Sequence, residues 1–389
     1  MGGMPGSRAE PAIVVGAGVI GLSVAYELAR RGRGVVVLER ERPGAGASGA
    51  AGGMLAPISE ADVEEPCLID LACDSLERYP GFVTGLERLT AAGCGLEREG
   101  TLWVALDRDD LGELERLAAV LRDKGLVTEP VGAAGARALE PHLSHRVTGG
   151  LRAAGDHQVD PRRLLRALEA AVAMLGGTIR IGARVTEIRQ RGGRVAGVSG
   201  TWRDGAGFTF DAPVVVLAAG AWSCDGIRSP LAAPRLRPVK GQLVRLRGPR
   251  LLTRVVRTPR VYLVPRDGGE LLVGATMEET GYDATPTAGA VLDLLRHGRE
   301  AVPGIYDSEL CEVSVGLRSA LDDHLPVIGQ SELPGLFLAY GHFRNGVLLA
   351  PATAHHLADW LERGEAPAAL RPFVPGRGSA AGVPALGRP

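Results

Sequence analysis

Short apolar runs alternate with amphipathic segments along most of the chain, and the clearest such pattern lies near its start. An apolar run at 12–15 ends in a glycine-rich turn, GAGVIG, at 16–21. A segment with helical spacing follows at 22–31, and a second apolar run at 35–38 ends on Glu39. This spacing predicts a strand–helix–strand unit with an acidic residue directly after its second strand.

This unit has the pattern of a dinucleotide-binding site. Gly16 permits a tight turn, Gly18 lets the backbone approach a pyrophosphate, and Gly21 allows the helix to pack closely on the strand. The free N–H groups at the start of the helix favour phosphate binding. Glu39 can accept hydrogen bonds from an adenosine ribose and would repel a 2′-phosphate, which disfavours NADP. An ordinary tight turn is the alternative in a chain with 55 glycines.

The same reasoning predicts the other elements. Helical spacing marks 67–89 (with a break or kink at Pro80-Gly81), 109–124, 162–175, 287–302 and 347–362. Strand patterns mark 100–105, 178–181, 185–190, 195–199, 213–217, 238–247, 260–265, 270–276 and 336–339. The apolar strand at 213–217 leads into a second glycine turn at Gly220. Because parallel-type strands lie far apart in the sequence, we expect a discontinuous sheet with an antiparallel domain inserted in it.

Composition excludes several classes of protein. The net charge of −1 gives no reason to expect nucleic acid or an anionic membrane as a partner. No apolar run is long enough to span a bilayer, and the first ten residues lack the apolar core of a signal peptide. We therefore expect a cytoplasmic protein. The cysteines show neither paired nor zinc-binding spacing, so we expect no metal site; they are Cys67, Cys73, Cys94, Cys224 and Cys311.

Several further blocks, taken in order, carry a resemblance to a known family. They are AAGGML at 50–55, PVKGQ at 238–242, YLVPR at 262–266, VGATM at 273–277, GLR at 316–318, and GHFRNG at 341–346 continuing to 353. The chain resembles the D-amino acid oxidase family of FAD-dependent flavoproteins, and most closely its glycine oxidases, over about residues 12–361.

The resemblance implies an α/β fold of two domains. A Rossmann-like FAD-binding domain would take residues 9–85, 146–230 and 311–370. An inserted antiparallel domain, at 86–145 and 231–310, would bind the substrate. Residues 371–389 are rich in Pro, Gly and Ala, and we expect a disordered tail there. By analogy the protein would form a homo-oligomer.

The resemblance also assigns residues to FAD. The first glycine turn would hold the pyrophosphate and Glu39 the adenosine. The loop at 47–54 would follow the ribityl chain and flavin ring, and 342–348 the pyrimidine side. The flavin-facing motif has no cysteine, so FAD would bind noncovalently. The predicted cofactor-binding residues are Gly16, Gly18, Val19, Ile20, Gly21, Glu39, Arg40, Ala47, Ser48, Gly52, Gly53, Met54, Val185, Gly220, His342, Phe343, Arg344, Asn345, Gly346, Val347 and Leu348.

The predicted substrate pocket centres on an arginine. Arg318 lies in an apolar context, and a planar guanidinium holds a carboxylate by two parallel hydrogen bonds. The alternative is a structural ion pair with Asp322 or Asp323. The resemblance adds the pocket residues Tyr262, Arg344, Met54 and Met277; without it, Tyr262 would be interpreted as a core residue.

The implied reaction is the oxidative deamination of glycine or a small amino acid. A hydride would pass from Cα to flavin N5 without a strong base, and the imine would hydrolyse to a 2-oxo acid such as glyoxylate. Oxygen would then be reduced to hydrogen peroxide. Such an enzyme could supply thiamine thiazole synthesis. A dehydrogenase with another electron acceptor and a non-catalytic nucleotide-binding module are the alternatives.

Some residues depart from the family pattern. Ser319 follows Arg318 where the family usually has proline, and Val315 stands where the family often has a tryptophan nearby. Arg260 replaces a histidine found in glycine oxidases. We expect Ser319 and Arg260 on the pocket side of Arg318 and Tyr262. These departures suggest, as a further alternative, an oxidase of N-substituted glycines in a specialised pathway.

Overall fold

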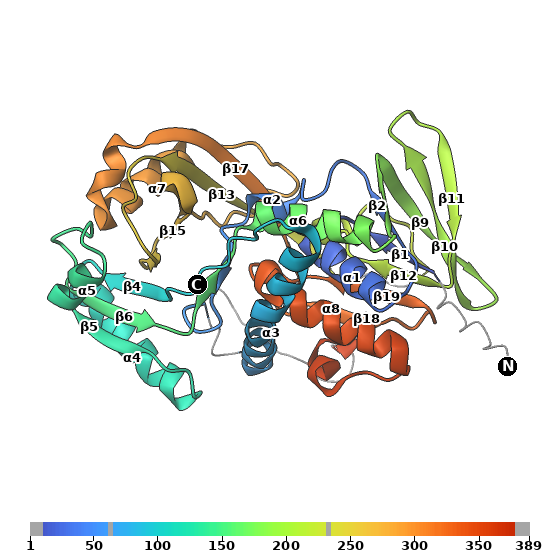
Figure 1. Ribbon diagram of the computed structural model, residues 1–389, viewed down its shortest axis with the longest axis horizontal. Helices are drawn as coiled ribbons and strands as arrows, with labels where there is room; N and C mark the ends of the chain where they lie inside the picture. Colours follow the sequence, from blue (N-terminus) through green and yellow to red (C-terminus); the bar gives the residue numbers. More distant parts are fainter. Residues whose placement is uncertain (1–10, 61–64, 231–234, 378–389) are drawn as a thin grey trace.

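The computed structural model describes residues 11–60, 65–230 and 235–377 (Figure 1). Its first sheet has the strand order β18-β19-β12-β1-β2-β8. All neighbours are parallel except β18 and β19, as expected for a discontinuous sheet. The strands are β1 (Ala12–Val15), β2 (Val35–Glu39), β8 (Thr178–Ile181), β12 (Val214–Leu217), β18 (Val327–Gln330) and β19 (Leu336–Tyr340).

The first sheet is covered on both faces because its central strands are apolar at every position. Val14 and Val216 pack with four helices, whereas Ile13 and Val215 pack with a three-stranded sheet. The helices are α1 (Val19–Arg30), α3 (Pro66–Thr90), α6 (Pro161–Met174) and α8 (Gly346–Arg363). The three-stranded sheet contains β9 (Ala183–Arg191), β10 (Arg194–Trp202) and β11 (Gly207–Asp211).

Pro80 does not break α3, which runs through it. The buried residues Tyr79, Val83 and Leu86 continue one apolar face past the proline. The free energy gained by burying that face outweighs the loss of the one backbone hydrogen bond that proline cannot donate.

The second sheet is eight-stranded, with the order β17-β13-β16-β15-β14-β4-β6-β5, and confirms the inserted antiparallel domain. Only the β14–β4 pair is parallel. Its strands are β4 (Thr101–Ala105), β5 (Glu129–Gly132), β6 (Gly149–Ala153), β13 (Arg237–Arg247), β14 (Val255–Arg257), β15 (Tyr262–Pro265), β16 (Glu270–Gly274) and β17 (Glu309–Ala320). The other helices include α4 (Arg108–Asp123), α5 (Ala133–Leu139) and α7 (Ala288–Ala301).

The sheet extends beyond the predicted boundaries at 145 and 311, because it includes β6 and the whole of β17. Several short elements complete the fold. They are α2 (Ala47–Ala50), β3 (Met54–Leu55), β7 (His157–Gln158), and the short 3₁₀ helices η1 (Gly220–Trp222), η2 (Asp267–Gly269), η3 (Pro303–Asp307) and η4 (Ala368–Phe373).

Ordered structure continues past residue 371, where the tail was expected to begin. Phe373 is fully buried in the core beside α3, and Arg377 pairs with Asp323 at 2.9 Å. The rest of the predicted tail, 378–389, lies outside the described residues. Within the described parts of the chain, no helix has both the length and the apolar character needed to cross a bilayer.

Candidate active site

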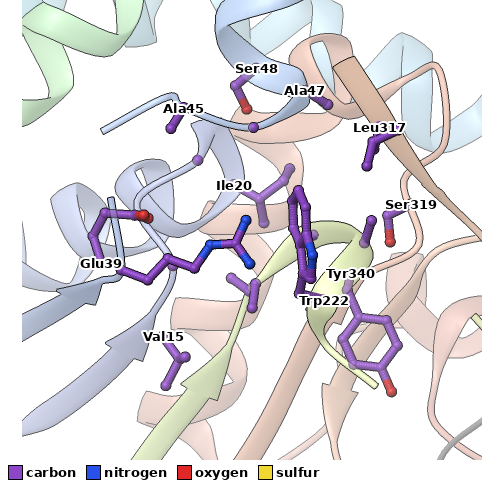
Figure 2. A pocket seen from close by; sticks show the side chains of 18 of the residues that line it. Val15, Ile20, Glu39, Ala45, Ala47, Ser48, Trp222, Leu317, Ser319 and Tyr340 are labelled. Carbon is purple, nitrogen blue, oxygen red and sulfur yellow. The ribbon is translucent and has the colours of Figure 1, made fainter. Parts of the chain in front are cut away.

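A cavity of about 540 Å³ opens at the carboxyl ends of β1, β2, β12 and β19 (Figure 2). Ligands of open parallel sheets bind at this edge. The structure brings many of the predicted FAD residues together here, although they come from distant parts of the chain. Those lining the cavity are Gly16, Gly18, Val19, Ile20, Glu39, Arg40, Ala47, Ser48, Val185, Gly220, His342, Phe343 and Gly346.

The first glycine turn is held by side chains that border the cavity. Gly16 has a φ of 102°, and a Cβ there would lie 3.0 Å from the Ala219 Cα. The Glu39 carboxylate accepts hydrogen bonds from the Ala17 N–H at 2.9 Å and the Glu41 N–H at 2.8 Å. Ser48 Oγ accepts one from the Val19 N–H at 3.0 Å. The acid after β2 is therefore fixed against the turn.

Trp222 contributes an aromatic face that the sequence reasoning did not select. Figure 2 shows its ring projecting into the cavity between Glu39 and Ser319. The Arg40 guanidinium lies 3.9 Å from the centre of this ring. The signal was present in the sequence, because Trp222 follows the second glycine turn at Gly220 directly. Aromatic and guanidinium planes together suit a flat heterocycle.

A second cavity of about 320 Å³ adjoins the first and shares Val19, Ala47, Ser48, Phe343 and Gly346 with it. All five predicted pocket residues line it: Arg318, Tyr262, Arg344, Met54 and Met277. Gly52, Gly53 and Val347 line it too.

Three predicted cofactor residues line neither of these two cavities. Gly21 packs against the Gly16 carbonyl, as expected from its role in helix–strand packing, and the Leu348 side chain lies in the core. Asn345 caps α8 and lines a separate cavity of about 340 Å³ with Met277, Phe343 and Arg344.

One face of the eight-stranded sheet forms the floor of the second cavity. Directly opposed residues of neighbouring strands share a face, as do alternate residues of one strand. Val239, Gly241 and Leu243 alternate along β13, and the strand pairing extends their face to both sides. The opposed pairs are Val239 with Arg318, Gly241 with Gly316, Leu243 with Gly274, Gly274 with Tyr262, and Tyr262 with Arg257.

Two glycines on this face let Arg318 and Tyr262 approach each other. The Arg318 guanidinium lies over Gly241, where an added Cβ would collide with it. A Cβ on Gly274 would lie 2.7 Å from the Tyr262 ring. β13 and β16 lie between the strands that carry Arg318 and Tyr262. The Arg318 side chain extends over Gly241 of β13, and the Tyr262 ring extends over Gly274 of β16.

Arg318 makes no ion pair with a carboxylate within the described residues. It donates hydrogen bonds to the carbonyls of Thr276 at 3.1 Å and Lys240 at 3.4 Å. Asp322 instead lies 3.8 Å from Arg237, and Asp323 pairs with Arg377. The alternative interpretation of Arg318 as a structural ion pair with either acid is therefore wrong. Burial raises the pKa of Tyr262 to about 12, so its hydroxyl remains protonated.

Comparison with known proteins agrees with this geometry. The model of the DAO family, FAD-dependent oxidoreductases, matches residues 12–360. The chain belongs to this family. Its FAD-dependent amine oxidation and its two-domain fold follow from membership together with the relatives below.

Two relatives and two solved structures match most of this chain. Glycine oxidase of Geobacillus kaustophilus is 36% identical, covering 92% of this chain and 95% of that protein. A crystal structure of glycine oxidase from that species has a TM-score of 0.86 and 34% identity, over 95% and 99% of the chains. The bifunctional protein ThiO/ThiG of Trichormus variabilis is 34% identical over 90% of this chain but 52% of its own length. Iminodiacetate oxidase of Chelativorans sp. BNC1 has a TM-score of 0.81 and 29% identity, over 94% and 98%.

The residues of this DAO-family chain fit FAD. The cavity runs from Glu39 to the N-terminus of α8, where backbone N–H groups favour negative charge. His342, just before α8, is 5% exposed, and burial lowers its pKa to about 3. The imidazole is therefore neutral, so His342 adds no positive charge to that of the helix N-terminus.

The loop predicted to face the flavin is held by a buried arginine. Arg266 is 5% exposed and donates hydrogen bonds to the Gly52 carbonyl, to the Val159 carbonyl at 2.8 Å and to Gln158 Oε1 at 2.6 Å. Burial lowers its pKa to about 10. The sequence indicated Arg266 only as the last residue of the YLVPR block. Its hydrogen-bond partners, at the end of β7 and in the 50–53 loop, are more than a hundred residues away in the sequence.

Gly241→Ala should weaken substrate binding through Arg318. The added methyl group would displace the guanidinium, and loss of a charged hydrogen bond should raise KM about tenfold to a hundredfold. FAD content and the flavin spectrum should persist. Gly132→Ala, an open position on the same sheet, is the matched control. Steady-state kinetics on both variants test this, and equal KM values in the two would contradict it.

His342→Gln should flatten the acid dependence of stability. Because the folded pKa is about 3 and the ordinary value 6.5, only the unfolded chain binds this proton between those limits. The stabilisation is therefore complete above pH 6.5 and falls as pH drops through this window, by up to about 1.4 kcal/mol per pH unit. Urea unfolding between pH 7.5 and 5 measures it. The exposed His145→Gln variant should follow the wild type.

Proposed function

We propose that this FAD-dependent amino acid oxidase acts on glycine or another short amino acid and uses oxygen as its electron acceptor. The convergence of Arg318 and Tyr262 over two glycines, beside the loop at 50–54, is the observation that carries the proposal. The identity to glycine oxidase supports it.

The proposed roles follow from the side chains that line the second cavity. Arg318 binds the substrate carboxylate in bidentate fashion, and the Tyr262 hydroxyl donates to it. Arg344 adds positive charge, while Met54 and Met277 enclose the carbon skeleton. Fixing the carboxylate orients Cα–H for transfer, so positioning supplies much of the rate acceleration.

When bound, FAD would supply a two-electron acceptor for the Cα hydride, with oxygen as the final electron acceptor and hydrogen peroxide as the product. The nitrogen lone pair forms the C=N bond, and water then converts the imine to glyoxylate and ammonia. Glu60 is the one carboxylate among the described residues lining the second cavity, and it pairs with Arg257 at 2.9 Å. A substrate ammonium would therefore lose its proton to solvent. No described residue lining either cavity is a cysteine, which supports noncovalent FAD.

The similarity to ThiO/ThiG supports a role in supplying thiamine synthesis. A second candidate is oxidation of an N-substituted glycine, supported by the likeness to iminodiacetate oxidase and by Arg260, which lines the second cavity. Ser319 does not contribute to this argument. It lines the cofactor cavity instead of the substrate cavity, and its Oγ accepts a hydrogen bond from the Gly341 N–H at 3.0 Å.

The purified protein should be yellow, release FAD rather than FMN on heating, and form equal amounts of glyoxylate and hydrogen peroxide from glycine. A peroxide-coupled assay with separate glyoxylate detection measures this. Glyoxylate that forms only with an artificial electron acceptor would indicate a dehydrogenase. A colourless protein that binds NAD would contradict the proposal.

Arg318→Lys should retain the fold and the flavin spectrum but raise KM for glycine about tenfold to a hundredfold, because a point charge replaces a bidentate fork. Arg163→Lys, at a half-buried position on α6, provides a control for arginine replacement elsewhere. Unchanged kinetics in the Arg318 variant would remove this residue from the site.

A further inference from the structure

The second cavity contains an ion pair for which glycine oxidation has no use. Glu60, after β3, accepts a hydrogen bond from Arg257 Nη1 at 2.9 Å. Both side chains are largely buried, with 13% and 22% exposed. Arg257 also lies 4.8 Å from the ring centre of Trp103, which faces it across β14 and β4. The pair therefore has a fixed orientation toward the cavity.

This pair and Arg318 lie on opposite sides of Tyr262. Arg257 is directly opposed to Tyr262 across β14 and β15, whereas Arg318 reaches the same sheet face from β17. The charges of Arg318, Glu60 and Arg257 all act on the Tyr262 hydroxyl. The cavity thus has two polar ends. Arg318 forms one, and the ion pair forms the other, which we name the Glu60–Arg257 subsite.

Anchoring the neighbouring loop does not account for the pair. The backbone N–H groups of Ile58 and Ser59 already donate to the buried Asp156 carboxylate at 3.1 and 3.2 Å. Burying two more charges beside this anchor is costly, so the pair adds little to the stability of the loop. Glycine would place its carboxylate at Arg318 and has no further polar group for the second end. A nitrogen substituent would supply one.

The charge of the subsite defines the substituent that it suits. Glu60 offers an acceptor and Arg257 further donors, and their charges cancel. Arg260 lies at the exposed rim, where its charge acts on Glu300 of α7. A carboxamide presents a carbonyl to the guanidinium and an NH₂ to the carboxylate, whereas a carboxylate would be repelled by Glu60.

We propose, building on amino acid oxidation as the function proposed above, that the Glu60–Arg257 subsite selects glycines whose nitrogen carries a short substituent ending in a carboxamide. The bond that is oxidised remains the glycine Cα–N bond. Glyoxylate is released, and the substituted amine leaves in place of ammonia.

Three compounds of matched shape test the proposal on the FAD-loaded enzyme. They are N-(carbamoylmethyl)glycine, N-(carboxymethyl)glycine and N-isobutylglycine, with glycine as the reference and glyoxylate as the measured product. We expect the amide to exceed both the acid and the apolar compound in kcat/KM by about tenfold or more, the effect of one charged hydrogen bond. Equal values, or a preference for the acid, would overturn the proposal.

Glu60→Gln sharpens the test because it removes the negative charge and leaves Arg257. The acid-to-amide ratio of kcat/KM should rise about tenfold. Arg257→Met should instead remove the advantage of the amide over N-isobutylglycine. Glu129→Gln breaks an exposed ion pair on the same sheet and should leave every ratio unchanged. If the pair only anchors the loop, its variants would change kcat/KM for all substrates by one common factor. That result would contradict selection by the subsite.

The outcomes separate this proposal from the function on which it rests. If neither glycine nor any N-substituted glycine is oxidised, the proposed function fails. If glycine is oxidised and the ratios among the three substituted compounds do not depend on Glu60 and Arg257, the function stands and the subsite is rejected.

Discussion

The site depends on close approach of side chains over a sheet that lacks Cβ atoms at two positions. Gly241 and Gly274 lie on one face of adjacent strands, and the Arg318 guanidinium and the Tyr262 ring occupy the space above them. Any larger residue would lift either group away from the sheet. The same ring packs against Gly52, where a Cβ would lie 2.9 Å from it. Three glycines from distant segments thus set the depth of the cavity.

The loop at 47–54 joins the cofactor and substrate halves, and arginines from elsewhere in the chain hold it. Arg162 at the start of α6 donates to the Gly49 carbonyl at 2.9 Å and pairs with Glu312 of β17 at 2.6 Å. This pairing holds the pKa of Glu312 at about 2. Arg266 binds the Gly52 carbonyl from the other side. The position of this loop, predicted to lie along the flavin, therefore depends on packing between the domains.

The parts of the structure that could be predicted are those with local signals. The β1–α1–β2 unit follows from apolar runs and glycine spacing, and family resemblance placed Arg318 and Tyr262 in one pocket. β17 escaped prediction because its exposed N-terminal half mixes polar and apolar residues, which only pairing with β13 organises. Glu60 and Arg257 are 197 residues apart in the sequence, and neither carries a pattern that links them.

The electrostatics of the second cavity explain why an amino acid, and not a simple amine, suits it. Arg257 is neutralised by Glu60, whereas Arg266, which does not line this cavity, donates to two carbonyls and an amide oxygen. Within the described parts of the chain, Arg318 donates hydrogen bonds only to carbonyls, which do not cancel its charge. A guanidinium left in this state attracts an anion and disfavours a bare ammonium. A substrate that brings its own carboxylate supplies the missing charge, so recognition and charge balance are the same interaction.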